Sequence, residues 1–226
     1  MAIGGLIGPV RAYLEGLTSV RLPGGSQGLG AQLAQALGLR PAIATGLATG
    51  AITLAVLGYC FADSAFRSSP VHILSGLGVG ACAILGWALT GLAYDELATR
   101  PTDPISLTYV RPTGDTLEWL QRFTATPWPG FGVATVLGAV LGSLAAAVAM
   151  GRFHIVGFSD TGDTVRSLLG ATLMGLGGVM AMGCTVGQAI TGVSTLAIGS
   201  FLTFVAIIFG GISGIRALER WLMSEA

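Results

Sequence analysis

The sequence predicts an all-α membrane protein, a polytopic bundle in which some helices are short, re-entrant or broken. One observation is composition: 52% of the 226 residues are hydrophobic and 10% are charged, whereas a soluble domain carries about 25% charged residues. Another is four uncharged runs, each with the roughly 20 residues that a helix needs to cross a membrane. A third is the 36 glycines, since glycine permits both close helix packing and helix breaks in membranes.

The four uncharged runs locate the expected membrane spans. Three of them suit a single crossing each and cover residues 41–62, 71–94 and 131–151. The fourth covers residues 167–215, which is enough for two crossings, or for a re-entrant hairpin followed by one crossing. We therefore expect about five passages through the bilayer, in a single membrane domain of residues 1–226.

The other segments complete this domain. Residues 1–40 combine turn residues with a short helical pattern, which predicts a half-helix or an interfacial helix. Residues 41–94 hold two spans, residues 95–130 are expected to form an external loop, and residues 131–226 form a C-terminal half.

The expected external loop carries much of the polar sequence. Within it, the segment DTLEWLQRF predicts a short amphipathic helix beginning near Asp115, with Trp119 and Trp128 suited to a membrane interface. Prolines exclude one regular helix over the whole loop; they are Pro101, Pro104, Pro112, Pro127 and Pro129.

Charge sets the expected location and excludes one class of partner. The eleven basic residues, all arginine, balance eleven acidic ones, so nothing suggests a nucleic-acid partner. If every run crosses once, one side collects the arginines that the positive-inside rule assigns to the cytoplasm; they are Arg67, Arg152, Arg166, Arg216 and Arg220. We expect a multi-pass protein of the cell inner membrane, in contact with the lipid bilayer.

The three cysteines predict neither a disulfide framework nor a metal site. Cys60, Cys82 and Cys184 are odd in number and show no C-x-x-C spacing. We expect no metal and no cofactor, and we interpret Cys60 and Cys82 as small hydrophobic residues of the core.

Cys184 differs because of the segment around it, GCTVGQAITG, residues 183–192. Three glycines in ten residues each cost a helix about 1 kcal/mol, while hydroxyl and amide side chains can satisfy backbone groups that a break releases. Transporters place binding sites at such interrupted helices. We therefore predict a helix break and a substrate pathway; its candidate residues are Gly183, Cys184, Thr185, Gly187 and Gln188.

The surroundings of Cys184 favour a weak contact over covalent chemistry. Residues 167–215 contain no His, Lys, Asp or Glu, and a nucleophilic thiol needs such a neighbour. Weak, neutral contacts suit transport, because a substrate must leave as readily as it enters. The alternative is that Cys184 is a small buried hydrophobe, just as Gly170, Gly175 and Gly178 suit ordinary helix packing.

Other polar residues have ordinary interpretations. His72 suits an interface, His154 a solvated linker, and the segment SDTGDTVR, with Asp160 and Asp163, a helix N-cap. Arg111 suits a loop anchor, although an external basic residue can attract an anion.

The segment RSLLGATLMGLGGVMAMGCTVGQAITGVSTLAIGSF resembles the C-terminal signature of the YeeE/YedE family, and DPISLTYVRPTGDTL resembles that family's external segment. The resemblance covers roughly residues 85–226. It implies a fold of two pseudo-symmetric halves with short helices inserted toward the membrane centre. It also implies thiosulfate uptake along a route lined by cysteines, of which one maps onto Cys184 and none onto Cys60 or Cys82.

The same resemblance implies partners. Members of the family are longer, and an N-terminal half with its own GC motif is expected from the same gene or from a partner chain, alongside a cytoplasmic sulfur-carrier protein. We expect a transporter of a small sulfur-containing anion, with thiosulfate as the substrate, and not an enzyme. Two alternatives stay open: a membrane sulfurtransferase in which Cys184 accepts sulfur, and a structural subunit without its own pathway.

Overall fold

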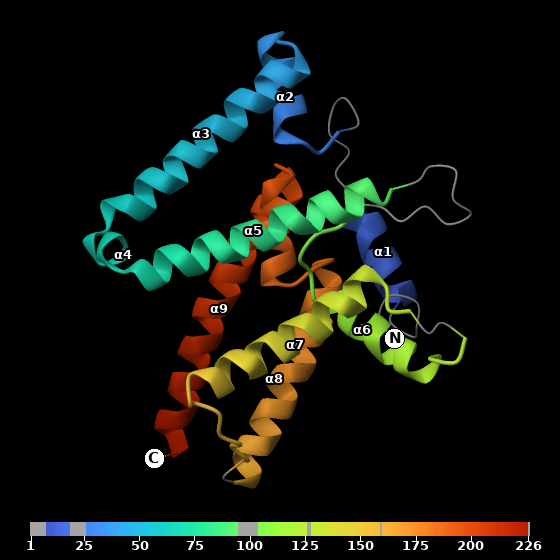
Figure 1. Cartoon of the computed structure of the whole chain (residues 1–226), viewed down its shortest axis with the longest axis vertical. Coiled ribbons are helices and arrows are strands. Elements are labelled where there is room, and N and C mark those ends of the chain that lie inside the picture. Colours follow the sequence, from blue (N-terminus) through green and yellow to red (C-terminus); the bar gives the residue numbers. More distant parts are fainter. Residues whose placement is uncertain (1–7, 19–25, 95–103, 126–127, 159, 226) are drawn as a thin grey trace. The chain divides into compact units, whose positions relative to one another are not determined.

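A computed structural model describes residues 8–18, 26–94, 104–125, 128–158 and 160–225. These residues form helices and connecting turns, with no β-strand in the described part of the chain (Figure 1). The chain divides into two compact units, one of Met1–Ser19 and Leu107–Val186, the other of Val20–Ser106 and Gly187–Ala226. We call them unit 1 and unit 2.

Within the described ranges, four helices are long and apolar enough to cross a membrane, which supports a multi-pass membrane protein. They are α3 (Pro41–Ala62), α5 (Pro70–Leu92), α7 (Phe131–Ala149) and the Ile198–Trp221 part of α9 (Ile198–Glu225). The first three agree with the expected spans to within two residues. The estimate of five counted residues 167–215 as two crossings, but α8 (Thr161–Met180) is not apolar enough to qualify.

Unit 1 contains α1 (Gly8–Thr18), α6 (Val110–Gln121), α7 and α8. The expected amphipathic helix is α6, but it begins at Val110 rather than near Asp115. Pro112 does not prevent this, because it lies in the first turn, where backbone N–H groups make no hydrogen bond within the helix and the missing N–H of proline costs nothing. A Cβ on Gly132 of α7 would lie 3.0 Å from Pro112 Cγ, so a glycine here lets α6 and α7 pack closely.

Unit 2 contains α2 (Leu29–Leu37), α3, α4 (Ser64–Ser68), α5 and α9. The short α2 confirms the helical pattern expected in residues 1–40, whereas residues 19–25 of that segment lie outside the described residues. It packs on α3 through Gly30, where an added Cβ would lie 2.7 Å from Thr45 Cα (Figure 1).

Ile105 and Ser106 of the polar loop are anchored on α5. Ser106, fully buried, donates a 2.7 Å hydrogen bond to the carbonyl of Ala83 and lies against Gly86. The Thr90 hydroxyl donates to the Ile105 carbonyl at 2.7 Å and accepts from the Ile105 amide at 3.1 Å. Residues 95–103 of the expected external loop, including Pro101, lie outside the described residues, as does Pro127.

The predicted N-cap before α8 is confirmed. The carboxylate of Asp160 accepts hydrogen bonds from the backbone amides of Thr161 at 2.7 Å and Gly162 at 3.3 Å. These bonds hold the pKa of Asp160 below its ordinary value of 3.8, because they stabilise the charged carboxylate.

Two packing expectations need correction. Cys82 is exposed on α5 and Cys60 is half-buried on α3, so neither is a core residue. In a membrane-spanning helix, small apolar residues such as these cysteines can face lipid as well as the protein core. Gly178 does pack closely, against Val110, but Gly170 and Gly175 have nothing within 4 Å of an added Cβ.

Candidate functional site

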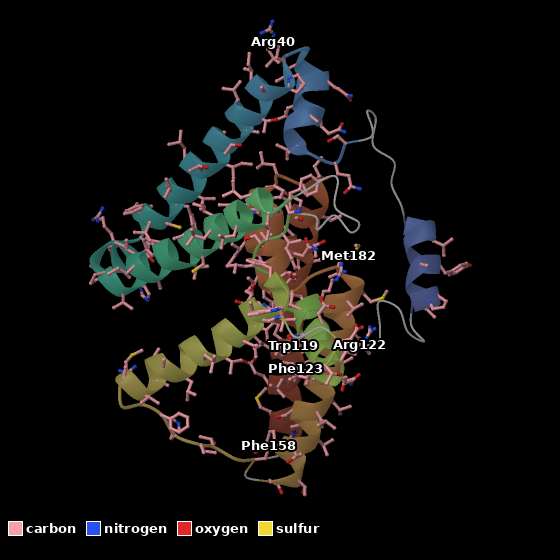
Figure 2. The ribbon with its side chains drawn as sticks, turned by 45° about the vertical axis from the view of Figure 1, so that its right-hand side comes forward. Arg40, Trp119, Arg122, Phe123, Phe158 and Met182 are labelled. Carbon is pink, nitrogen blue, oxygen red and sulfur yellow. The ribbon has the colours of Figure 1, made fainter. Side chains whose placement is uncertain are left out.

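A tight turn ends α8 immediately before the Gly-Cys pair. The amide of Gly183 donates to the Gly178 carbonyl at 2.9 Å, and the amide of Met182 donates to the Val179 carbonyl at 3.1 Å. This pair of bonds is a Schellman motif, which places the residue corresponding to Met182 in the left-handed conformation. Met182 has φ 55° and lies at the end of α8 (Figure 2). The turn usually carries glycine here, because a side chain makes this conformation unfavourable.

The predicted helix break is confirmed at this turn. Cys184 follows it in a non-helical conformation and is half-buried. The next regular element is a π-helix, Val186–Gly192. A π-helix is a wide, rare turn that occurs mostly at functional sites. The thiol therefore lies where an α-helix has ended and another helical geometry has not yet begun.

The structure places the candidate pathway residues one after another along this break. Gly183 is buried, Cys184, Gly187 and Gln188 are half-buried, and Thr185 is exposed. Gly183, Cys184 and Thr185 belong to unit 1, which ends at Val186, whereas Gly187 and Gln188 begin the second part of unit 2. Their roles in a pathway stay predictions.

A second left-handed residue ends the broken segment. Leu196 has φ 55° and is buried. Its carbonyl accepts a 2.8 Å hydrogen bond from the Leu29 amide, and the Ile198 amide donates to the Gln27 carbonyl at 3.0 Å. This short antiparallel bridge joins the start of α9 to the start of α2. The segment between α8 and α9 thus has a left-handed residue near each end, Met182 and Leu196. This conformation is unfavourable for residues that carry a side chain.

Side chains of unit 2 hold the end of the π-helix. The indole Nε1 of Trp87, on α5, donates to Ser194 Oγ at 3.2 Å, and that hydroxyl donates to the Thr191 carbonyl at 2.6 Å. Gly192 is equally constrained, because an added Cβ would lie 2.8 Å from Ser200 Cβ and 3.1 Å from Gln188 Oε1.

A cavity of about 240 Å³ adjoins the turn within unit 1. Its lining comes from the start of α6 and from the end of α8 with the following turn; the residues are Thr108, Val110, Arg111, Gly178, Val179, Met182 and Gly183. Arg111 is its only charged lining residue. The cavity therefore carries the positive charge of Arg111, and its lining extends to Gly183, the residue before Cys184.

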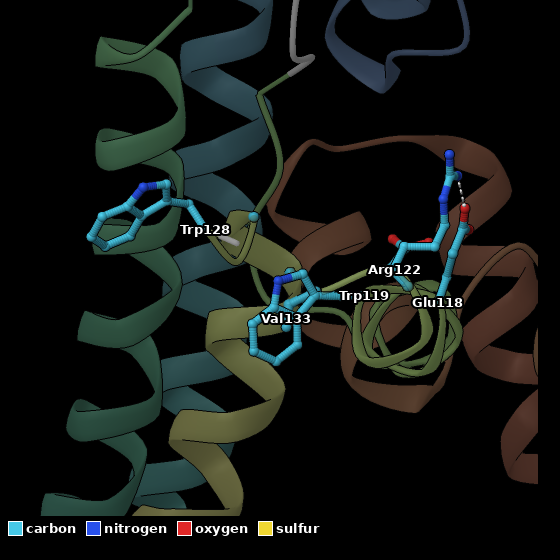
Figure 3. Close-up of a pocket in the computed structure, with 8 residues that line it drawn as sticks. Glu118, Trp119, Arg122, Trp128 and Val133 are labelled. Carbon is cyan, nitrogen blue, oxygen red and sulfur yellow. Dashed lines mark hydrogen bonds and ion pairs between the residues drawn. The ribbon is translucent and has the colours of Figure 1, made fainter. Parts of the chain in front are cut away.

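A larger cavity of about 360 Å³ lies between α6 and the start of α7 (Figure 3). Asp115 and Glu118 contribute carboxylates to its lining, and Glu118 pairs with Arg122 at 2.8 Å. Trp119 projects toward Val133, and its Nε1 is the one buried side-chain nitrogen or oxygen without a hydrogen-bond partner among the described residues. With two carboxylates against one lining guanidinium, that of Arg122, this cavity is a poor host for an anion.

The remaining polar residues lie outside the broken segment. His72 is exposed at the start of α5 and stacks on Phe66, with ring centroids 6.4 Å apart. His154 is exposed and its Nδ1 lies 2.9 Å from the Arg152 carbonyl oxygen. In the part of the chain that is described, no three His, Cys, Asp or Glu side chains gather as metal ligands.

Sequence reasoning missed the residues that shape the break. The glycines indicated that a helix would end, but nothing marked Met182 and Leu196 as left-handed, because both are poor residues for that conformation. The support from Trp87 links residues that are 107 positions apart. Only the tertiary structure brings them together.

Comparison with known proteins gives a matching family and curated relatives. A family described as sulphur transport matches residues 23–213. The thiosulfate transporter TsuA of Spirochaeta thermophila is 34% identical over 101 residues, covering 43% of this chain and 30% of the relative. The thiosulfate transporter TsuA of Escherichia coli is 30% identical over 135 residues, covering 58% of this chain and 35% of the relative. The chain therefore spans about a third of the length of these curated relatives. No solved structure matches it significantly.

Proposed function

This chain belongs to the sulphur transport family, the YeeE/YedE family that its sequence resembles, and on that basis we propose that it takes part in thiosulfate uptake across the cell inner membrane. The observation that carries the proposal is the helix break at Cys184, which lies inside the region matched by the family. The relatives named as thiosulfate transporters support the choice of substrate. Their names also favour transport over enzymatic activity.

Cys184 contacts the sulfur end of the anion in this proposal. A thiol is a weak hydrogen-bond donor with a polarizable sulfur, so it can recognise a sulfane sulfur without holding it tightly. Thr185 and Gln188 supply a hydroxyl and an amide to the constriction. Gly183 and Gly187 bracket Cys184 and permit the break in the helix that this route requires.

The pathway requires more than this chain supplies in our proposal. Transporters built from repeats place the site between two halves, and the relatives are about three times longer than the segment that they share with this chain. An N-terminal half or a partner chain completes the route, and a thiolate of a cytoplasmic sulfur-carrier protein accepts the sulfane sulfur of the imported thiosulfate, with sulfite as the leaving group.

Uptake of radiolabelled thiosulfate by cells lacking their own transporter tests the proposal. The chain is expressed alone and together with the N-terminal region of the Spirochaeta thermophila relative. We expect Cys184→Ala to abolish uptake, or to reduce it at least about tenfold, with normal protein levels, because removing a half-buried sulfur costs little stability. Cys184→Ser retains a hydrogen-bonding group but loses the soft sulfur, and we expect intermediate or no activity.

Cys82→Ala is the matched control, because this cysteine is exposed on α5 and has no part in the proposed route. Normal uptake by a well-expressed Cys184→Ala variant overturns the role of the thiol. A persulfide on Cys184, detected by mass spectrometry during turnover, favours a sulfurtransferase instead. Substitutions at Cys184 and Gln188 that change complex assembly and leave flux unchanged favour a structural subunit.

A further inference from the structure

The cavity beside the Gly-Cys turn is built by a close approach of two helices. A Cβ on Gly178 of α8 would lie 2.9 Å from Val110 Cγ2 at the start of α6. Only a glycine lets the two helices meet this closely without displacing Val110. The contact holds the first turn of α6, which carries Arg111, against the last turn of α8 and the residues that precede Cys184.

The polar groups of the cavity suit an anion. Arg111 and Thr108 are the only lining residues with polar side chains, and no carboxylate joins them. The described residues provide no hydrogen bond to the Thr108 hydroxyl. A guanidinium can bind an oxyanion through two parallel N–H donors, and a free hydroxyl can add a third.

Arg111 is only loosely engaged by the protein. Its Nε lies 3.8 Å from Asp115 Oδ2, and the two side chains are 75% and 50% exposed. An exposed ion pair at this distance contributes little to stability. By contrast, Arg122, the residue directly after α6, contacts the Glu118 carboxylate at 2.8 Å. Arg111 is thus the less tightly paired of these two arginines, and its charge is available to a ligand.

We propose that this cavity is a capture site for small sulfur oxyanions, in which Arg111 binds the oxygen end and Thr108 assists it. Gly183 lines the cavity and Cys184 follows it directly, so an anion held there adjoins the turn that leads into the broken helix. The proposal rests on the proposed function, which supplies the class of anion.

The competing interpretation is that Arg111 merely anchors the start of α6 through Asp115. The two interpretations make opposite predictions for Asp115→Asn. If the ion pair is what matters, this variant behaves like Arg111→Gln. If Arg111 captures the anion, the Asp115 carboxylate competes with the anion for Arg111, and removing that carboxylate leaves the affinity for thiosulfate unchanged or raises it.

Equilibrium binding of radiolabelled thiosulfate to the purified full chain in nanodiscs tests the capture site without requiring transport. We expect Arg111→Gln to weaken binding about tenfold, the order that one charge-assisted hydrogen bond provides. Arg111→Lys keeps the charge but loses the paired donors, and we expect a smaller loss. The Arg111-dependent part of binding decreases as salt rises, because exposed charges are screened. Arg122→Gln, the matched control, binds as the wild type does.

Several outcomes overturn the capture site: no binding by the wild type, equal binding by Arg111→Gln, an equal loss in Arg122→Gln, or a loss in Asp115→Asn. If instead the proposed function is wrong and the capture site is right, binding still depends on Arg111, but sulfate or phosphate binds as tightly as thiosulfate does. In the uptake assay, we expect Arg111→Lys to raise KM and leave kcat unchanged, since capture precedes passage. An unchanged KM contradicts the proposal.

Discussion

At the scale of single residues, Met182 adopts an unfavourable backbone conformation at the point where α8 ends. Its left-handed backbone, with φ 55°, costs a side-chain-bearing residue about 1–2 kcal/mol. The two hydrogen bonds of the turn and the close contact between Gly178 and Val110 hold it in place. Such costs persist at functional sites because the surrounding structure maintains them.

Replacing Met182 with glycine is therefore expected to stabilise unit 1. Glycine removes the cost of the left-handed backbone, but it also makes the unfolded chain more flexible, which opposes folding. The expected net gain in the free energy of unfolding is about 0.5–1 kcal/mol. Thermal unfolding in detergent measures the shift as a higher Tm. The control is Met174→Gly, at a 77% exposed position inside α8, which we expect to destabilise by about 1 kcal/mol. If both variants lower the Tm, Met182 is not under strain.

At the scale of elements, the π-helix depends on a neighbouring helix. Its end is held through Ser194, which accepts from Trp87 at 3.2 Å and donates to the Thr191 carbonyl at 2.6 Å. A π-helix is rarely stable by itself. The C-terminal end of the π-helix, at Thr191, therefore depends on α5 as well as on its own segment.

Trp87→Phe tests this dependence, because phenylalanine keeps an aromatic ring but lacks the indole donor. We expect amide hydrogens of residues 187–194 to exchange about 5-fold faster, the effect of losing roughly one hydrogen bond. Ser194→Ala should give a similar change, and the double variant should add little to either. Trp128→Phe serves as the control, since Trp128 is 87% exposed. Additive effects of the two substitutions would show that the residues act separately.

The elements also show what the sequence could and could not predict. Uncharged runs located α3, α5 and α7 to within two residues, because the length of a membrane span is set by the bilayer. The break at Gly183 was predictable, since glycines and polar side chains coincide there. The start of α6 was placed about five residues too late, because Pro112 suggested a boundary but is tolerated in a first turn. The π-helix, the left-handed Met182 and the charge of the cavity arise from tertiary contacts.

At the scale of the whole molecule, the chain forms two compact units whose sequences interleave. Unit 1 ends at Val186 and unit 2 resumes at Gly187, so the boundary falls inside the GCTVGQ segment. The candidate pathway residues Gly183 to Gln188 therefore belong to both units along the chain. The chain spans about a third of the length of its curated relatives.

We therefore expect the purified 226-residue chain to bind thiosulfate but not to transport it when it is reconstituted alone in liposomes. Transporters of this kind place the site between two repeats, and this chain holds a single Gly-Cys motif. The nearest internal echo, residues 76–91, lies within the continuous helix α5, whereas the Gly-Cys segment is broken. Uptake should appear when a longer N-terminal region or a partner chain is added to the same liposomes. The Cys184→Ala variant of the completed assembly controls for leakage. Robust uptake by the chain alone would mean that it forms the whole route by itself, and the idea of a missing half would then be wrong.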